Sequence, residues 1–423
     1  MPIASPRRLL GSLLSLVLVA CGPGPSPSPT LEATPSPTAA SSPAASVDAA
    51  AVYGAIARQV EAIRGLQPTG DVAPVLLDAD QLRANLTATF DKDNPPAAVR
   101  ETEALYRVLG LLPLDVSLRT AELDLLAGQV AGYYSPDQKQ LFVVSRSGGI
   151  GPSQRVTYAH EFTHQLQDQH FDLAKVQGSA TGQGDRSLAV LALIEGDAVS
   201  VQTAWTAANL NAADLAQLLA DASDPSVVQS LLDAPPILRL LSLAPYTAGQ
   251  AFVAALQASG GEAAVNAAFR DPPSSTSEVV HPDLYATHAP PGPVAWVTDL
   301  RAALGSGWSS LGQDTLGELF VRSWLQAGGV PVAQAGTAAA GDEADRIELF
   351  AGPAGQVAAA IQLRWSSDAD ADEFLAAWQL VRSKVVGLPA VTTSGHTVTL
   401  TIAPSQAMAD ALLQQLVGPV PVR

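Results

Sequence analysis

Apolar residues recur at helical spacing over much of the chain before residue 290. The spacing predicts helices over residues 47–66 and 96–130, and a series of shorter helices over residues 205–270. Proline or paired glycine interrupts that series at three places, Asp224-Pro225, Pro235-Pro236 and Gly260-Gly261. We find no internal repeat at a fixed period. The pattern therefore predicts a largely helical body.

Two β-rich runs, residues 130–134 and 140–145, lie within this body. The residues between them, 135–139, include Ser, Pro and Asp and are typical of a turn. The runs therefore predict a β-hairpin, followed by a helix that contains the most informative stretch of the chain. Tyr133 and Tyr134 are candidates for contact with a ligand, although aromatic residues in a strand are more often part of a core.

The pattern changes near Pro291-Gly292-Pro293. A helical stretch over 315–327 and a low-complexity run over 332–341 precede a predicted β-β-α-β-α series, formed by residues 346–350, 357–365, 368–386, 397–402 and 405–416. We interpret residues 296–423 as a small accessory α+β module packed on the helical body. The only histidine in the series is His396, which lies beside Gly395 in a sequence typical of a turn, and we expect a scaffold or a partner surface there.

The helix after the hairpin contains His160-Glu161-Phe162-Thr163-His164. Residues four apart share a helix face, so His160 and His164 can present two imidazoles to one metal ion. Glu161 lies beside them, where it can take a proton from water activated by the metal. This is the H-E-x-x-H pattern of two zinc ligands and a general base. With six histidines in the chain, a chance match has odds of roughly a few in a thousand; the alternative is a surface helix that merely contains the motif.

A zinc site of this kind needs a third protein ligand, and Glu195 is the best candidate. It lies in an otherwise apolar helix that we expect from about Ser187 to Leu210, after a flexible, glycine-containing connection over 172–186. A carboxylate within an apolar face is expensive to bury unless it is paired or bound to metal. Three protein ligands leave a fourth position open for water, which is typical of a catalytic site. The alternative is that Glu195 caps or pairs on a solvated edge.

With this ligand set the chain resembles the gluzincin metallopeptidases, the thermolysin-like group with H-E-x-x-H on one helix and a glutamate on a later one. It is also similar to a group of uncharacterised bacterial lipoproteins over roughly residues 60–289. The shared phrases begin here at Gly132 (G-Y-Y-S-P), His160 (H-E-F-T-H-Q-L-Q-D-Q-H-F), Glu195 (E-G-D-A) and His281 (H-P-D-L-Y). Gln165 departs from the more common H-E-x-x-H-A-L, and an uncharged side chain there should not disturb a metal.

The resemblance implies an α+β fold, with a mostly helical zincin-type peptidase domain over residues 47–295 and a small sheet ahead of the H-E-x-x-H helix. It implies one Zn²⁺ ion on His160, His164 and Glu195, with Glu161 as the base in hydrolysis of a peptide or protein substrate. In gluzincins the edge strand ahead of the zinc helix lines the cleft and can pair with an extended substrate. The alternative is a lipoprotein that keeps the fold and works as a non-catalytic binding or assembly module.

Other residues are weaker candidates. His281 and Tyr285 lie at a suitable distance downstream to stabilise an oxyanion, and Tyr246 and His288 are equally possible. The imidazoles that bind the metal also need acceptors for their second N–H groups, and the candidates for this role are Asp168 and Asp197. His170 should point away from the ligand face.

The first 46 residues predict export and anchoring. Arg7 and Arg8 precede an apolar run over 9–20 that is too short to span a membrane, so residues 1–21 resemble a signal peptide. Its end, Leu18-Val19-Ala20-Cys21, resembles a bacterial lipobox. Cys21 is the only cysteine and cannot form an internal disulfide, which favours lipidation over an incidental thiol in an ordinary secretory signal. Residues 22–46 are almost entirely Pro, Ser, Thr, Ala and Gly and predict a disordered tether.

We therefore expect a protein of the bacterial cell envelope, held on the extracytoplasmic side of a membrane by lipid on Cys21. The formal net charge of −17 argues against a nucleic-acid partner, because a surface that binds phosphate would be basic.

The lipobox is tested by Cys21→Ser. We expect this change to block incorporation of labelled lipid, to alter processing and to release the protein from the detergent phase, because stable anchoring needs the attached acyl chains. Lipid incorporation equal to that of the wild type would contradict the prediction.

Overall fold

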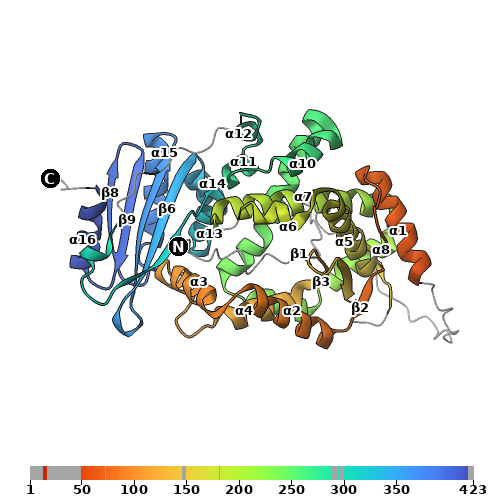
Figure 1. Ribbon diagram of the computed structural model, residues 1–423, viewed down its shortest axis with the longest axis horizontal. Coiled ribbons are helices and arrows are strands. Elements are labelled where there is room, and N and C mark those ends of the chain that lie inside the picture. Colours follow the sequence, from red (N-terminus) through yellow and green to blue (C-terminus); the bar gives the residue numbers. More distant parts are fainter. Residues whose placement is uncertain are drawn as a thin grey trace, which may run out of the picture.

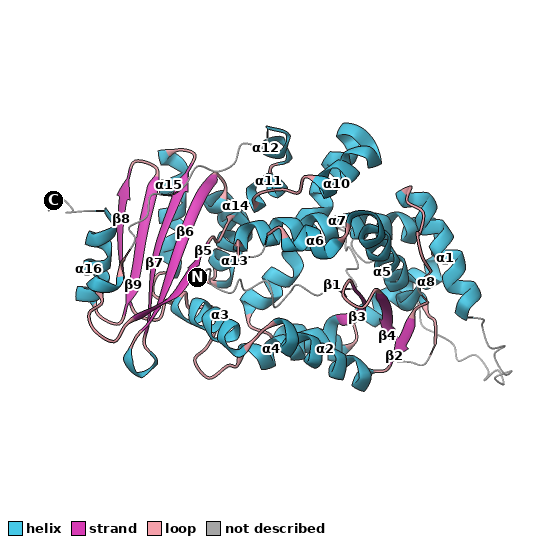
Figure 2. Ribbon diagram, viewed as in Figure 1, coloured by secondary structure: helices cyan, strands magenta, loops and turns pink. Residues whose placement is uncertain are grey.

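The computed structural model of the chain (Figure 1) describes residues 49–71, 73–144, 149–180, 182–287, 294 and 299–417, and the backbone alone of residues 13–16. Cys21, the tether over 22–46 and the candidate His288 lie outside the described residues. The chain is α+β, as the sequence predicts. Figure 2 shows a five-stranded sheet at one end of the molecule and a helical body with a smaller sheet toward the other end.

The helical body contains, in chain order, α1 (Ala49–Arg64), α2 (Ala79–Asp93), α3 (Pro96–Val108), α4 (Leu118–Gln129), α5 (Pro152–Phe171), α6 (Leu173–Gly178), α7 (Gly184–Asn209), α8 (Ala212–Ala222), α9 (Pro225–Asp233), α10 (Pro236–Arg270), α11 (Thr276–Val280) and α12 (Pro282–Thr287). Two expectations need correction. Helix α2 was not predicted, although a capping box of Asp78 and Gln81 marks its start. The connection expected to be flexible contains α6, whose first turn is capped by Asp172.

The smaller sheet has the strand order β1-β3-β4-β2. Its centre is the predicted hairpin, in which β3 (Val130–Ser135) pairs antiparallel with β4 (Gln140–Val144). Strand β2 (Val75–Leu77) lies parallel to β4, and β1 (Leu13–Leu16) lies antiparallel to the other edge of β3. Tyr133 and Tyr134 are both buried, which favours the alternative that they are core residues over contact with a ligand.

Helix α7 runs through the middle of the body and packs against α5 and α10. It is long and apolar enough to cross a membrane, but 78% of its most apolar stretch is buried inside the protein, as in the core helix of a folded domain. Helix α10 contains Pro245 and changes direction at Gly260 and Gly261, the glycine pair predicted as a break.

The C-terminal module is built on a sheet with the antiparallel order β5-β6-β7-β9-β8. Its elements are β5 (Ser309–Asp314), α13 (Glu318–Ala327), α14 (Val332–Ala339), β6 (Asp342–Ala351), β7 (Val357–Trp365), α15 (Asp368–Val381), β8 (Leu388–Ser394), β9 (Thr397–Ala403) and α16 (Gln406–Val417), with short 3₁₀ turns at Arg301–Ala303 and Pro353–Gly355. Helices α13 to α15 pack against one face, where the core is continuous with that of the body, and α16 packs against the other.

The prediction of three strands for this module was incomplete. The missing strands, β5 and β8, are the two edges of the sheet, and both have largely exposed or partly exposed residues. Edge strands need no continuous apolar pattern, which is why periodicity did not reveal them. The low-complexity run forms α14, with Ala335, Ala338 and Ala339 buried.

Acidic side chains gather at the junction of the helical body and the sheet module: Asp185, Asp314, Glu318, Asp342 and Asp345. Several of these side chains form hydrogen bonds or ion pairs between the helical body and the sheet module. The amide of Gly184 donates to Asp314 Oδ1 at 2.7 Å, and His281 Nε2 lies 3.0 Å from Glu318 Oε1. The start of α7 is thereby fixed to the sheet module.

Two of these carboxyls retain protons unusually well. Burial, reinforced by the neighbouring carboxyls of Asp345, Asp185 and Glu318 and opposed by Arg364, raises the pKa of Asp342 well above its ordinary value. Burial also raises the pKa of Asp345 to about 7, although the amides of Leu316 and Gly317 oppose the shift. The Oδ1 atom of Asp342 has no hydrogen-bond partner within the described structure.

These shifts predict how stability depends on pH. The folded chain binds protons at Asp342 and Asp345 more tightly than the unfolded chain, so this contribution to stability is complete below the ordinary carboxyl pKa. It is lost as pH rises through the raised pKa of each group, which is about 7 for Asp345. We expect Asp342→Asn, which mimics the neutral carboxyl, to raise the melting temperature at mildly alkaline pH by a few degrees and to flatten its pH dependence.

Thermal unfolding across this pH range measures the effect. The matched control is Asp372→Asn on the exposed side of α15, which should follow the wild type. A pH dependence unchanged by Asp342→Asn would show that Asp342 does not hold a proton in the folded chain over this range.

Candidate metal centre

Helix α5 carries the H-E-x-x-H residues through the interior of the helical body. It begins with Pro152 at its first turn and ends where Asp172 adopts a left-handed conformation, with φ of 58°. Between these ends it packs against the β3-β4 hairpin, α1 and α7. Every residue from Val156 to Asp168 is consequently buried, which excludes the alternative of a motif on a surface helix.

Three ligand atoms converge at the centre of this packing. The Nε2 atoms of His160 and His164 are 3.0 Å apart, and they lie 3.2 Å and 3.4 Å from Oε2 of Glu195 on α7. The two histidines are 0% exposed and Glu195 is 1% exposed, so Glu195 is not on a solvated edge. Among the described residues, this is the group of His, Cys, Asp and Glu side chains close enough together to hold a metal ion.

Two glutamines determine which nitrogen of each imidazole carries the proton. Nδ1 of His164 lies 2.8 Å from Oε1 of Gln167, and Nδ1 of His160 lies 2.9 Å from Oε1 of Gln202. The amide orientation of Gln167 is fixed because its Nε2 donates to the Ile194 carbonyl and to Asp197 Oδ2. Since an amide oxygen only accepts, Nδ1 donates in each pair, and Nε2 is the nitrogen that holds the lone pair when the imidazole is neutral.

The donor set fits a zinc ion. Three lone-pair atoms that face one another in a buried space repel unless a cation or a proton lies between them. Tetrahedral zinc with bonds of about 2.0–2.2 Å separates its ligand atoms by about 3.3–3.6 Å. The three separations found here are within a few tenths of an ångström of that range. Two imidazoles and one carboxylate are also a ligand combination typical of catalytic zinc.

The electrostatics of the group match a cation at its centre. Burial opposes charge on His164, but the Glu195 carboxylate outweighs this effect and raises the pKa of His164 to about 9. Burial likewise opposes charge on Glu195, yet the two imidazoles lower the pKa of Glu195 to about 2. Burial lowers the pKa of His160 and so favours its neutral form. The carboxylate therefore stays ionised and attracts positive charge to this point.

Glu161 lies beside the group, under strand β3. Its carboxyl accepts a hydrogen bond from the backbone amide of Tyr134, and burial raises its pKa well above the ordinary value. Gly132 on β3 makes this approach possible. A Cβ atom there would lie 3.5 Å from Glu161 Cγ and only 2.5 Å from the Thr157 side chain. A buried carboxyl with a raised pKa is suited to accept a proton during a reaction.

The structure corrects the two predicted acceptors for the ligand imidazoles. Asp168 binds the Tyr134 hydroxyl and Lys139 Nζ instead, at 2.8 Å and 2.7 Å. Asp197 does not bind an imidazole directly. Gln167 lies between Asp197 and His164 and forms a hydrogen bond to each. The glutamines themselves were not predicted. The signal available for Gln202 was its position two helical turns after Glu195, on the same face of α7.

Two of the candidates for oxyanion stabilisation are engaged elsewhere. His281 pairs with Glu318 at the junction, and the Tyr285 hydroxyl donates to the Asp271 carbonyl. Tyr246 is the aromatic candidate that reaches the group, since its ring lies 6.2 Å from the His160 ring. His170 contacts the Gln67 carbonyl and is not a ligand, in agreement with the prediction.

Comparison with known proteins bears on the C-terminal module alone. Residues 302–413 match a family described as a domain of unknown function, DUF8575. This segment corresponds closely to the five-stranded sheet and its helices, and leaves the helical body outside the match. Searches of curated proteins and of solved structures gave no match to the chain.

The glutamine contacts lead to a prediction about metal affinity. We expect Gln167→Met, which removes the acceptor of the His164 Nδ1 proton, to weaken zinc binding by about ten- to a hundredfold. Competition with a chelating dye measures this affinity. Gln165→Met, on the same helix but facing Gly70, should bind zinc like the wild type. Equal affinities for all three proteins would rule out a role for Gln167 in orienting the ligand.

Proposed function

We propose that the chain is a zinc-dependent peptidase of the gluzincin type. The observation that supports this most is the buried convergence of His160 Nε2, His164 Nε2 and Glu195 Oε2, with the Glu161 carboxyl beside it. A zinc ion bound by these atoms would polarise a scissile carbonyl and make water more acidic. On the sequence grounds given above, we propose that lipid on Cys21 holds the enzyme at the outer side of a membrane.

In this proposal, orientation of the imidazoles and proton transfer are carried out by different residues of the chain. Gln167 and Gln202 hold the two imidazoles in the required tautomer and orientation. Glu161 takes the proton from the attacking water and passes it to the leaving amine. Its raised pKa supports this assignment, because a carboxyl that holds a proton well can store it between the two transfers.

Strand β3 offers an edge for an extended substrate. The edge opposite β4 is paired with the chain's own segment Leu13–Leu16, antiparallel and with Leu14 opposite Tyr133. That segment also lies against α5. A peptide strand of similar length placed on the same edge would gain backbone hydrogen bonds beside Glu161. This pairing supports a peptide as the substrate class.

One observation favours the alternative of a non-catalytic binding module. All four site residues are at most 1% exposed, whereas hydrolysis requires that a substrate reach them. In this alternative the metal would stabilise a fold whose surface binds a partner.

The test separates chemistry from metal binding. Glu161→Gln keeps the size of the side chain and removes its basicity, so zinc content should stay the same while hydrolysis of a peptide library falls by about a hundred- to ten-thousandfold. Glu195→Gln should lose zinc, because a neutral amide replaces a charged ligand. Elemental analysis and mass spectrometry of the cleaved library provide the two readouts.

Glu373→Gln is the control, since that side chain is exposed on α15, far from the group in the sequence. Equal turnover by wild type and Glu161→Gln would exclude water activation by Glu161. Stoichiometric zinc without turnover in the wild type would favour the binding module instead.

A further inference from the structure

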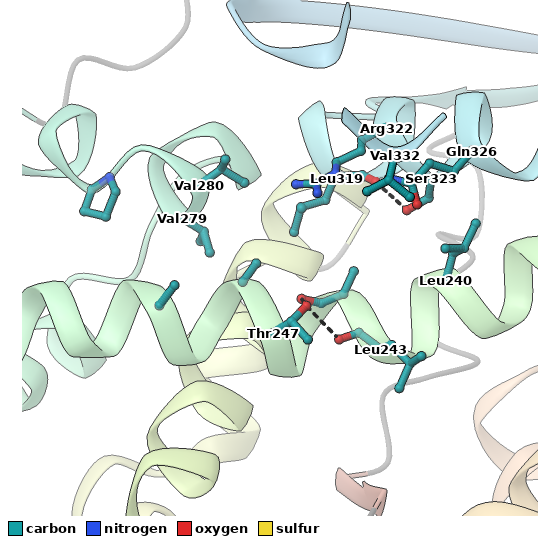
Figure 3. A pocket seen from close by; sticks show the side chains of 14 residues that line it. Leu240, Leu243, Thr247, Val279, Val280, Leu319, Arg322, Ser323, Gln326 and Val332 are labelled. Carbon is teal, nitrogen blue, oxygen red and sulfur yellow. Dashed lines mark hydrogen bonds between the residues drawn. The ribbon is translucent and has the colours of Figure 1, made fainter. Parts of the chain in front are cut away.

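A concave site lies between the helical body and the sheet module (Figure 3). It is a groove of about 610 Å³ between α10, α11, α13 and α14. This volume is within the range of sites that bind small molecules. Its walls are mainly aliphatic, with Leu240, Leu243, Ala248, Val280, Leu319 and Val332 among the lining residues.

The groove is separate from the metal centre. None of its lining residues belongs to the metal-binding group. The two sites use opposite faces of α10, because Leu243, Thr247 and Ala251 follow one helical stripe, whereas Tyr246 and Gly249 face α7 and His160. An inference about the groove is therefore independent of the proposed peptidase activity.

The polar groups of the groove are nearly all engaged. The hydroxyl of Ser323 donates to the Leu319 carbonyl at 2.7 Å, and that of Thr247 to the Leu243 carbonyl at 3.3 Å, as the dashed lines in Figure 3 show. Both hydroxyls thus donate to backbone carbonyls of their own helices. What remains available to a ligand is the guanidinium of Arg322 and the amide of Gln326.

Arg322 provides a positive charge without a partner in the described part of the chain. It is partly buried and its side chain extends from α13 along the groove toward Val280 (Figure 3). Glu318, one helical turn earlier, pairs with His281 instead. A cation that faces aliphatic walls favours a ligand that is both apolar and anionic.

We propose that the groove binds a long-chain alkyl carboxylate, with its hydrocarbon chain along the aliphatic walls and its carboxylate on Arg322. The walls of the groove explain why it should bind an alkyl carboxylate in preference to a hydrophobic peptide. They are helix faces whose backbone groups are already bonded, so the amides of a bound peptide would lose water without gaining partners. An alkyl chain has no such groups, and its carboxylate matches the planar guanidinium with two parallel hydrogen bonds.

The experiment is isothermal titration of the full chain with laurate, below the micelle concentration. The protein carries Cys21→Ser, so that no lipid of its own competes. We expect saturable binding at a ratio of one to one, and no comparable binding of dodecanol. Arg322→Gln should weaken laurate binding by about tenfold or more. Arg382→Gln, an exposed arginine at the end of α15, is the matched control and should leave binding unchanged.

A second variant tests the walls. Ala251 lines the groove but is itself exposed, so Ala251→Trp should fill the groove without disturbing the fold, and laurate affinity should fall. Absence of saturable binding would overturn the proposal, as would equal affinity of wild type and Arg322→Gln. Tighter binding of an apolar peptide with a free C-terminus than of laurate would replace the proposed ligand by a peptide.

Discussion

The geometry of the candidate metal centre depends on one buried ion pair, between Arg64 of α1 and Asp197 of α7. Their charged atoms are 2.8 Å apart and both side chains are 0% exposed. An arginine keeps its charge inside a protein, so its burial requires a charged partner. The same aspartate accepts a hydrogen bond from Gln167, which in turn accepts the proton of His164 Nδ1. A helix that contributes no residue to the group of His160, His164 and Glu195 thereby fixes the orientation of the His164 ring.

Backbone contact between two helices fixes the opposite side of the centre. A Cβ atom on Gly196 would lie 2.1 Å from the backbone of Gly249, so α7 and α10 touch without side chains between them. Glu195 directly precedes this contact, which sets how deep its carboxylate lies. Tyr246, nearly one turn before Gly249, is brought beside His160 by the same contact. Even a methyl group at Gly196 would force the helices apart and move Glu195 with them.

The part of the centre that the sequence predicts is the part that local geometry determines. His160, Glu161 and His164 lie within two turns of one helix, and Glu195 stands out as a carboxylate in an apolar run. The supporting residues depend on partners distant in sequence. Asp168 and Asp197 looked equally suitable as acceptors, but Lys139 and Arg64 engage them, and no local pattern indicates those pairs. Amide side chains such as Gln202 carry neither charge nor apolar periodicity, so periodicity and charge gave no signal for them. The same reason applies to the missed edge strands β5 and β8.

Helix α7 connects the two ends of the molecule. Its first amide, that of Gly184, donates to Asp314 at the end of β5, and Asp185 accepts from the Thr276 amide. About ten residues later, roughly 15 Å along the helix axis, the same helix presents Glu195. The core cluster is also shared, since Tyr106 of the body stacks on Phe320 of the sheet module with ring centres 6.3 Å apart. The sheet module is therefore a structural part of the helical body rather than an appendage, because it holds the start of the helix that carries Glu195.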